Sequence, residues 1–177
     1  MNIFILALDP DKAAQYQCDK HVPKMLLESA QLLCSAFPEG TAPYKRTHYH
    51  HPCAKWVRES PFNYAWLVQH GLELASEYAR RYGKRHASES VIVYCRDYAE
   101  TEVFYENEDV AHIALSEASL QNVNWRGFTT PFVQAMPEKY RHRNPVTAYR
   151  AYYIGEKARF AKWERGRPEP PWWRKDN

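Results

Sequence analysis

Several features that mark common classes of protein are missing from this sequence. No stretch approaches the roughly 20 consecutive apolar residues that span a bilayer, and the opening apolar run at residues 3–8 is too short for a signal peptide and lacks a cationic flank. There is no glycine-rich phosphate loop, no nucleophile elbow, no H-E-x-x-H metal motif and no sustained heptad repeat. We therefore expect a cytoplasmic protein with no membrane contact, no nucleotide-dependent chemistry and no cofactor.

Cysteine is scarce, and the cysteines are widely spaced. The chain has four of them and no Cys-x-x-Cys pair, so the sequence predicts neither a zinc knuckle nor a dense disulfide framework. We expect reduced thiols, most of them in the core, at Cys18, Cys34, Cys53 and Cys95.

The rest of the composition fits one folded domain. With 177 residues, 45% of them hydrophobic and 15% aromatic, the chain can fill one core. It contains no internal repeat and no domain linker. We predict a monomer with a single domain over residues 1–177 and an irregular, proline-rich tail at 168–177.

The formal net charge of +3 hides an uneven distribution. Residues 100–125 carry six acidic side chains and no Lys or Arg, which leaves 24 basic and 15 acidic residues elsewhere. We interpret residues 99–130 as an acidic surface insertion. From Arg126 onward, twelve Lys or Arg side chains stand against five acidic ones and are interleaved with Tyr and Trp. This pattern is typical of a polyanion-binding surface with stacking groups, or of an ordinary solvated surface.

Hydrophobic periodicity and capping residues predict an all-α fold. Asp9-Pro10 and Asn144-Pro145 are typical helix starts, and Gly83 is a typical helix stop. The clearest pattern predicts a helix over residues 61–82, where apolar side chains recur at helical spacing. Weaker patterns predict one short N-terminal strand at 3–8 and helices at 10–19, 23–36, 52–58, 88–98 and 145–160, the last bent or interrupted near Gly155.

One candidate site lies at the junction of the first two predicted helices. The spacing of Lys24 and Glu28 places them on one helix face with His21 above them. Asp19 is placed to orient the imidazole, which gives His21 a general-base role near neutral pH. The alternative is a helix-capping cluster with an incidental Lys–Glu pair.

Residues 44–58 form a second stretch rich in His, Arg, Lys and Tyr. Its H-x-H-H-x-C pattern matches none of the usual zinc spacings, so we expect no metal. We interpret the stretch as a loop that offers donors to phosphates ahead of a helix start. The alternative is an exposed polar loop whose Pro52 and Trp56 pack on the core.

A third stretch, residues 149–173, places aromatic side chains beside cations. Such pairs suit bases displaced from a duplex, and each stack is typically worth about 1–3 kcal/mol. Alternatively, Tyr149, Tyr152 and Tyr153 belong to the core because they recur at helical spacing, and Trp172 and Trp173 form an interface.

Taken in order, these stretches resemble the phage pyrimidine-dimer DNA glycosylase (endonuclease V) family. Ala13-Ala14-Gln15, followed by residues 20–24, resembles the family segment that holds two arginines around a catalytic glutamate. Residues 72–83 are similar to the family's middle helix, and residues 50–52 resemble an asparagine-histidine-proline motif of its bacterial branch. Residues 144–157 resemble the aromatic C-terminal segment that lies close to the damaged bases. The likeness is collinear and leaves out residues 99–130.

The resemblance implies a viral, all-helical protein that binds duplex DNA, kinks it and extrudes a base, with glycosylase and abasic-site lyase activity. Lys20 and Lys24 then take the phosphate-gripping role of the family arginines, as point charges without the bidentate fork. In the family, the α-amine of a small residue behind the removed methionine attacks the sugar. Here Asn2 is large, which predicts that Met1 is retained, and His21 stands at the position of the family glutamate.

The catalytic residues are therefore open between alternatives. The nucleophile is the Met1 amine or a desolvated Lys20 or Lys24, and the acid/base is His21 or Glu28. On the same fold, the protein could instead modify an extruded base without excising it, or bind DNA without catalysis. The expected DNA-binding residues are Arg46, His48, His50, His51, Lys55, Arg58, Arg80, Arg81, Lys84, Arg150, Tyr152, Tyr153 and Lys157.

Overall fold

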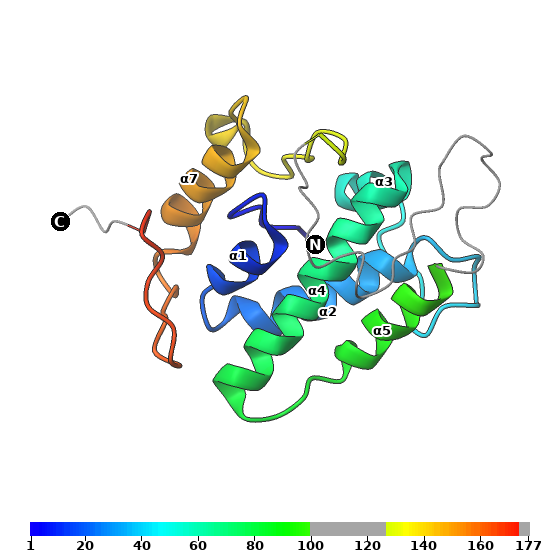
Figure 1. The fold of residues 1–177 in the computed structure, drawn as a ribbon. Helices are drawn as coiled ribbons and strands as arrows, with labels where there is room; N and C mark the ends of the chain where they lie inside the picture. Colours follow the sequence, from blue (N-terminus) through cyan, green and yellow to red (C-terminus); the bar gives the residue numbers. More distant parts are fainter. Residues whose placement is uncertain (100–126, 174–177) are drawn as a thin grey trace.

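The computed structural model describes residues 1–99 and 127–173, and within them the chain is helical and has no strand. The predicted all-α fold is confirmed, while most of the acidic insertion predicted at 99–130 lies outside the described residues. The elements in order are α1 (Pro10–Gln15), α2 (His21–Cys34), α3 (Pro52–Glu59), α4 (Pro61–Tyr82), α5 (Ser88–Ala99), the 3-10 helix η1 (Glu138–Tyr140) and α7 (Pro145–Lys157) (Figure 1). None of these helices is long and apolar enough to cross a membrane.

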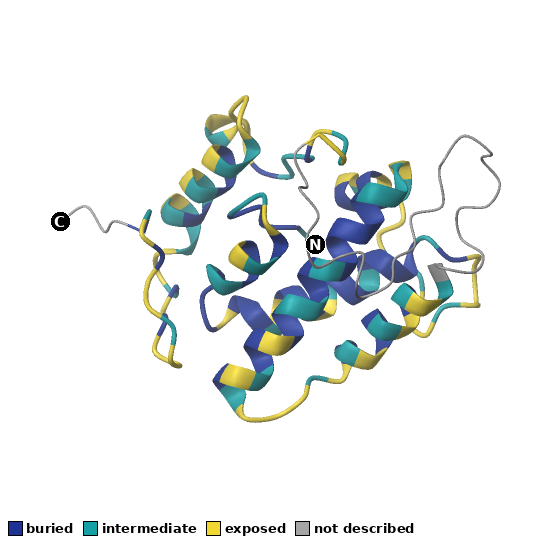
Figure 2. Cartoon of the chain, in the orientation of Figure 1, coloured by how far each residue is buried: buried dark blue, intermediate teal, exposed yellow. Residues whose placement is uncertain are grey.

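Helix α4 runs through the middle of the molecule, and α1, α2, α3 and α5 all pack against it (Figure 1). It has the predicted bounds because both of its ends are set locally. The Ser60 hydroxyl accepts a hydrogen bond from Phe62 N, and Pro61 takes the first helical position. Gly83 ends the helix in the left-handed conformation, at φ 67°, which costs a glycine little. Most of the helix surface is buried (Figure 2).

Helix α2 also contributes to the core, through residues that include Leu26, Leu32 and Leu33, which are fully buried. It begins at His21, ahead of the predicted start at Pro23. Proline is tolerated there because the first turn of a helix leaves its N–H groups without intrahelical partners. By contrast, α1 ends at Gln15, before the predicted end at residue 19.

The N-terminal segment fills the space between the helical body and α7. Its apolar residues 3–6 are buried, but they form no strand, so the predicted N-terminal strand is wrong. Side chains satisfy the carbonyl groups in place of a partner strand: Arg150 Nε donates to Leu6 O at 2.9 Å, and Trp66 Nε1 donates to Leu8 O at 2.8 Å.

Helix α7 continues through Gly155 without the predicted interruption and ends at Lys157. A Cβ at Gly155 would lie 2.3 Å from the Tyr140 hydroxyl, so glycine permits the close approach of η1 to α7. The chain then returns over the helical body without regular structure as far as Trp173, with Trp163 and Trp173 buried.

A buried ion cluster ties this returning segment to α4. The Arg81 side chain is fully buried and donates to Glu77 at 2.8 Å and to Asp19 at 3.1 Å. Arg167 binds the same Glu77 carboxylate. Burial raises the pKa of Glu77, but hydrogen bonds and charge from Arg167 and Arg81 outweigh it, so its pKa lies below the ordinary value.

We predict that Glu77→Gln lowers the free energy of unfolding by about 3–5 kcal/mol, because it leaves the Arg81 charge buried with one partner fewer. Urea unfolding at pH 7.5 measures this loss. Glu89→Gln is the matched control, since it breaks an exposed i,i+4 pair with Arg85 and should cost no more than about 1 kcal/mol. Equal losses in the two variants would contradict the prediction. The Glu77 contribution is present at neutral pH and disappears as the pH falls through the depressed pKa.

Candidate active site

The first residues of the chain are anchored against the middle of α2. Asn2 N donates a hydrogen bond to Glu28 Oε2 at 2.8 Å. The Asn2 side chain is held as well, because its Nδ2 donates to Ala135 O at 2.9 Å and its Oδ1 accepts from the Tyr149 hydroxyl at 2.9 Å. The sequence separations are large, so the fold assembles this arrangement from distant parts of the chain. It fixes the N-terminus beside a carboxylate.

Two further side chains adjoin this N-terminus. His51 caps α3 by accepting a hydrogen bond from Cys53 N at its Nδ1, at 3.1 Å. Burial lowers the pKa of His51, and the positive Met1 amine lowers it further. Burial also raises the pKa of the Cys53 thiol to about 12, so this thiol is protonated at neutral pH and is no nucleophile. The N-terminal cluster thus consists of Met1, Asn2, Glu28, His51 and Cys53.

Glu28 lies at the centre of the N-terminal cluster. Only 12% of its side chain is exposed, and its second oxygen, Oε1, lies 3.8 Å from Lys24 Nζ. The carboxylate therefore contacts the chain terminus on one side and a lysine on the other. Such a group can accept a proton from an amine and return it to a leaving group.

An open depression of about 580 Å³ adjoins the N-terminal cluster. Ala135, which accepts from Asn2, lies in its wall, and so does Pro52, which stands between His51 and Cys53. Its other lining residues are Phe132, Val133, Gln134, Arg141, His142 and Arg143. The sequence did not predict Asn2, Arg141 or Arg143 as site residues; the excess of basic residues beyond Arg126 was the only signal for the two arginines.

His21 lies in a different environment from the one predicted. Its ring is buried and packs on Phe4, Tyr153 and Phe160 with centroid separations of 4.9–5.2 Å. Burial, followed by the charges of Lys157, Lys24 and Lys20, lowers its pKa to about 3. This low pKa disfavours a general-base role for His21 near neutral pH, because the ring then has little affinity for a proton.

Asp19 does not orient the His21 ring. Its carboxylate accepts from Arg81 and from Glu164 N, at 3.1 and 2.7 Å. Within residues 1–99 and 127–173, His21 Nδ1 has no hydrogen-bond partner although it is buried. His21 borders a second depression, of about 390 Å³, whose other lining residues are Lys20, Lys24, Arg159 and Phe160.

Two residues predicted to bind DNA are buried instead. Arg81 is held inside the ion cluster, where its guanidinium also donates hydrogen bonds to the carbonyl groups of Gln15 and Gln17. Tyr153 is fully buried, and its hydroxyl accepts a hydrogen bond from Cys18 N at 3.0 Å. Helical spacing favours burial of Tyr153, and both side chains are enclosed by the protein in this structure.

The other α7 residues that were predicted to bind DNA make contacts within the protein. Arg150 donates to Leu6 O, and its guanidinium lies over the rings of Tyr16 and Trp172. Tyr152 is half-buried, and Lys157 Nζ lies 3.4 Å from its hydroxyl. Arg150 thus holds α7 onto the body of the protein, whereas the contact between Tyr152 and Lys157 lies within α7.

In the loop before α3, the Tyr49 ring contacts two guanidinium groups. Arg46 lies 4.5 Å and Arg58 3.7 Å from its ring centroid. Arg58 also donates to Tyr49 O at 2.8 Å. His48, His50 and Lys55 are exposed. In the described part of the chain, no three His, Cys, Asp or Glu side chains are grouped to hold a metal ion.

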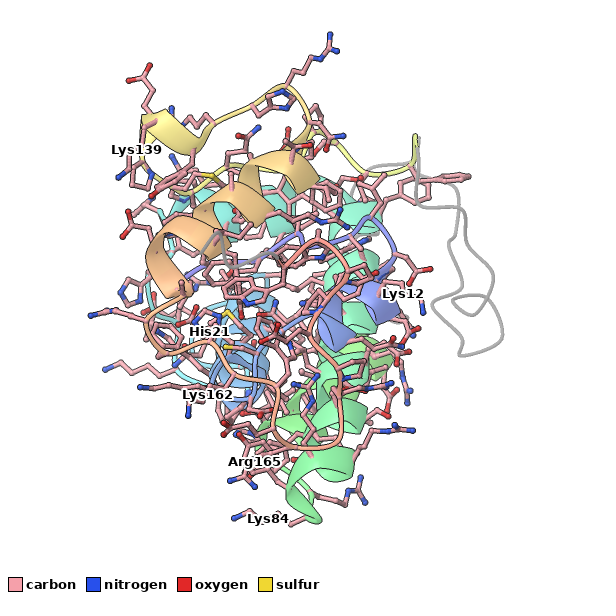
Figure 3. The ribbon with its side chains drawn as sticks, turned by 90° about the vertical axis from the view of Figure 1, so that its left-hand side faces the viewer. Lys12, His21, Lys84, Lys139, Lys162 and Arg165 are labelled. Atoms are coloured by element: carbon pink, nitrogen blue, oxygen red, sulfur yellow. The ribbon has the colours of Figure 1, made fainter. Side chains whose placement is uncertain are left out.

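Arg80 and Lys84 are exposed at the C-terminal end of α4. Figure 3 places Lys84 at the lower end of the molecule, with His21 higher up and Lys139 near the top. These two cations are therefore remote from the loop that joins η1 to α7.

We predict that the burial of His21 makes the fold sensitive to acid. The residue is neutral when folded, but in the unfolded chain it binds a proton below about pH 6.5, so stability falls as the pH drops from 6.5 towards 3. His21→Phe should reduce the slope of unfolding free energy in this window by up to about 1.4 kcal/mol per pH unit. Urea unfolding at a series of pH values measures the slope, and identical slopes for both proteins would contradict the assignment. His70, whose pKa is also lowered, to about 4, is unchanged in this comparison.

The N-terminal half of the chain is similar to a known protein family. A family model described as pyrimidine dimer DNA glycosylase matches residues 1–90. The match covers α1 to α4 and all of the N-terminal cluster. No curated protein and no solved structure is similar enough to this chain to be matched. Since the family model spans half of the chain, this protein belongs to the pyrimidine dimer DNA glycosylase family.

Proposed function

We propose that this protein excises a damaged or modified pyrimidine from duplex DNA and then cleaves the strand at the abasic site. The contact between Asn2 N and Glu28 carries the proposal, because it joins the start of the chain to a carboxylate that is largely but not fully buried. The family supports DNA as the substrate, and the basic depression beside the N-terminal cluster supports phosphate binding there.

The nucleophile in this scheme is the α-amine of the chain. With Met1 retained, that amine lies near His51, one residue before the nitrogen that contacts Glu28. With Met1 removed, the amine would be the Asn2 nitrogen itself, 2.8 Å from Glu28. The neutral amine attacks C1′ of the sugar, and the C1′–N bond to the base breaks with its electron pair on the base, which takes up a proton. The ring oxygen O4′ then leaves C1′, gains a proton and leaves an imine between the enzyme and C1′.

Glu28 is the group that moves protons in this scheme. The imine acidifies the hydrogen on C2′, the carboxylate takes that proton, and the 3′-phosphate leaves with the electron pair of the C3′–O bond. His21 is a poor substitute because its pKa of about 3 makes it a weak base. Lys20 and Lys24 are exposed, so burial does not activate them as nucleophiles.

Borohydride trapping tests the proposal. End-labelled duplexes that carry a thymine dimer, an abasic site or 5-hydroxymethyluracil are incubated with the protein, with and without borohydride. A trapped adduct and strand cleavage on one of them are expected. A changed base mass with an intact glycosidic bond would contradict excision and indicate base modification on this fold. Binding without chemical change would contradict catalysis altogether.

We predict that Glu28→Gln lowers the rate of adduct formation by about 10²–10⁴-fold, the range typical for loss of a general acid/base. The amide is nearly isosteric and can still accept a hydrogen bond from Asn2 N, so binding of the duplex should change little. Glu39→Gln is the control, because Glu39 is an exposed carboxylate of the loop after α2. An E28Q protein that forms the adduct at the wild-type rate would remove Glu28 from the mechanism.

A further inference from the structure

The loop between η1 and α7 presents two arginines that the described part of the chain leaves without acidic partners. Arg141 and Arg143 are exposed, line the larger depression, and take part in no ion pair among residues 1–99 and 127–173. The neighbouring Lys139, in contrast, lies 3.2 Å from Glu156. The two arginines therefore add uncompensated positive charge to this edge of the depression.

The backbone of this loop is held in place. His142 N donates to Gln134 Oε1 at 3.0 Å, and Gln134 Nε2 donates to His142 O at 2.6 Å. His142 Nδ1 accepts from Asn144 N, and Asn144 in turn caps α7 through Val146 N. The loop is thus ordered before any ligand binds, which lowers the entropy cost of binding.

The loop also lies next to the N-terminal cluster. Ala135, in the wall of the same depression, accepts the Asn2 amide, and Asn2 N contacts Glu28. Glu28 then pairs with Lys24, which lines the second depression. The two depressions are therefore linked through Glu28, and each carries cations. A duplex, with one negative charge per about 1.7 Å of its axis, offers phosphates to both.

We infer that Arg141 and Arg143 form a phosphate anchor for duplex DNA, separate from the one at Lys20 and Lys24. The inference rests on the proposed function, since it assigns part of the substrate to the same site. Guanidinium groups suit this role because their planar donors bind phosphate in pairs. Both residues line the same depression, so their side chains can act on the same stretch of a duplex.

Salt-dependent binding tests the anchor. The affinity of the full-length protein for an undamaged duplex is measured by fluorescence anisotropy at several salt concentrations. Because each neutralised phosphate contributes about 0.9 to the slope of log affinity against log salt, the double variant R141A/R143A should lower the slope by about 2. Its affinity should fall roughly tenfold or more at low salt. R141K/R143K should restore the slope, since lysine keeps the charge.

The matched control is K12A/R85A, which removes two exposed cations that lie outside the predicted DNA-binding residues. It should leave the slope near that of the wild type. An unchanged slope in R141A/R143A, or an equal loss in K12A/R85A, would overturn the anchor.

Trapping assays separate this inference from the proposed function. With saturating abasic-site duplex, R141A/R143A should form adduct at the wild-type maximal rate but require more DNA to reach it. Loss of maximal rate with unchanged salt dependence would overturn the anchor and leave the proposed function standing. Conversely, a lower slope in R141A/R143A together with no adduct from the wild type would support the anchor and contradict the proposed chemistry.

Discussion

The hydrogen bond from Asn2 N to Glu28 is the interaction on which the rest of the site depends. It holds the chain terminus against α2, and the Asn2 side chain extends the link to α7 through Tyr149 and to the segment before η1 through Ala135. Burial raises the pKa of Tyr149, so its hydroxyl stays protonated as a donor. Elements that are distant in sequence thus meet at the start of the chain. Both the proposed chemistry and the proposed phosphate anchor follow from this meeting point.

Burial decides which of the candidate groups can act. His21 and Glu28 lie on the same helix, yet His21 is enclosed by aromatic rings and cations, which keep it neutral. Glu28 is partly accessible and contacts two nitrogen donors. A neutral ring with a pKa of about 3 packs well beside three lysines because it adds no positive charge to them. We therefore assign His21 to the support of the site and propose Glu28 as the group that takes part in its chemistry.

Local sequence signals predicted the parts of this fold that are determined locally. The bounds of α4 follow from Ser60, Pro61 and Gly83, whose capping roles need no tertiary contact. The burial of Arg81 could not be predicted from local signals. An arginine near the end of an amphipathic helix is usually exposed, and this one is buried because Asp19 and Glu77 surround it.

The site itself was predictable only in part. Helical spacing brought Lys24 and Glu28 together, and the structure places them 3.8 Å apart. The partners of Asn2 lie 26 to 147 residues away in sequence, so no periodic pattern reveals them. The missed arginines, Arg141 and Arg143, lie in a loop without regular structure, where periodicity carries no information.

The most direct test of this account is to locate the covalent bond in the borohydride-trapped protein–DNA adduct. The adduct is digested with a protease and a nuclease, and the peptide that carries the sugar remnant is sequenced by mass spectrometry, which also identifies the first residue of the chain. We predict that the remnant is attached to the α-amine of the N-terminal peptide. Attachment to the side chain of Lys20 or Lys24 would contradict the account, because the nucleophile would then lie outside the N-terminal cluster.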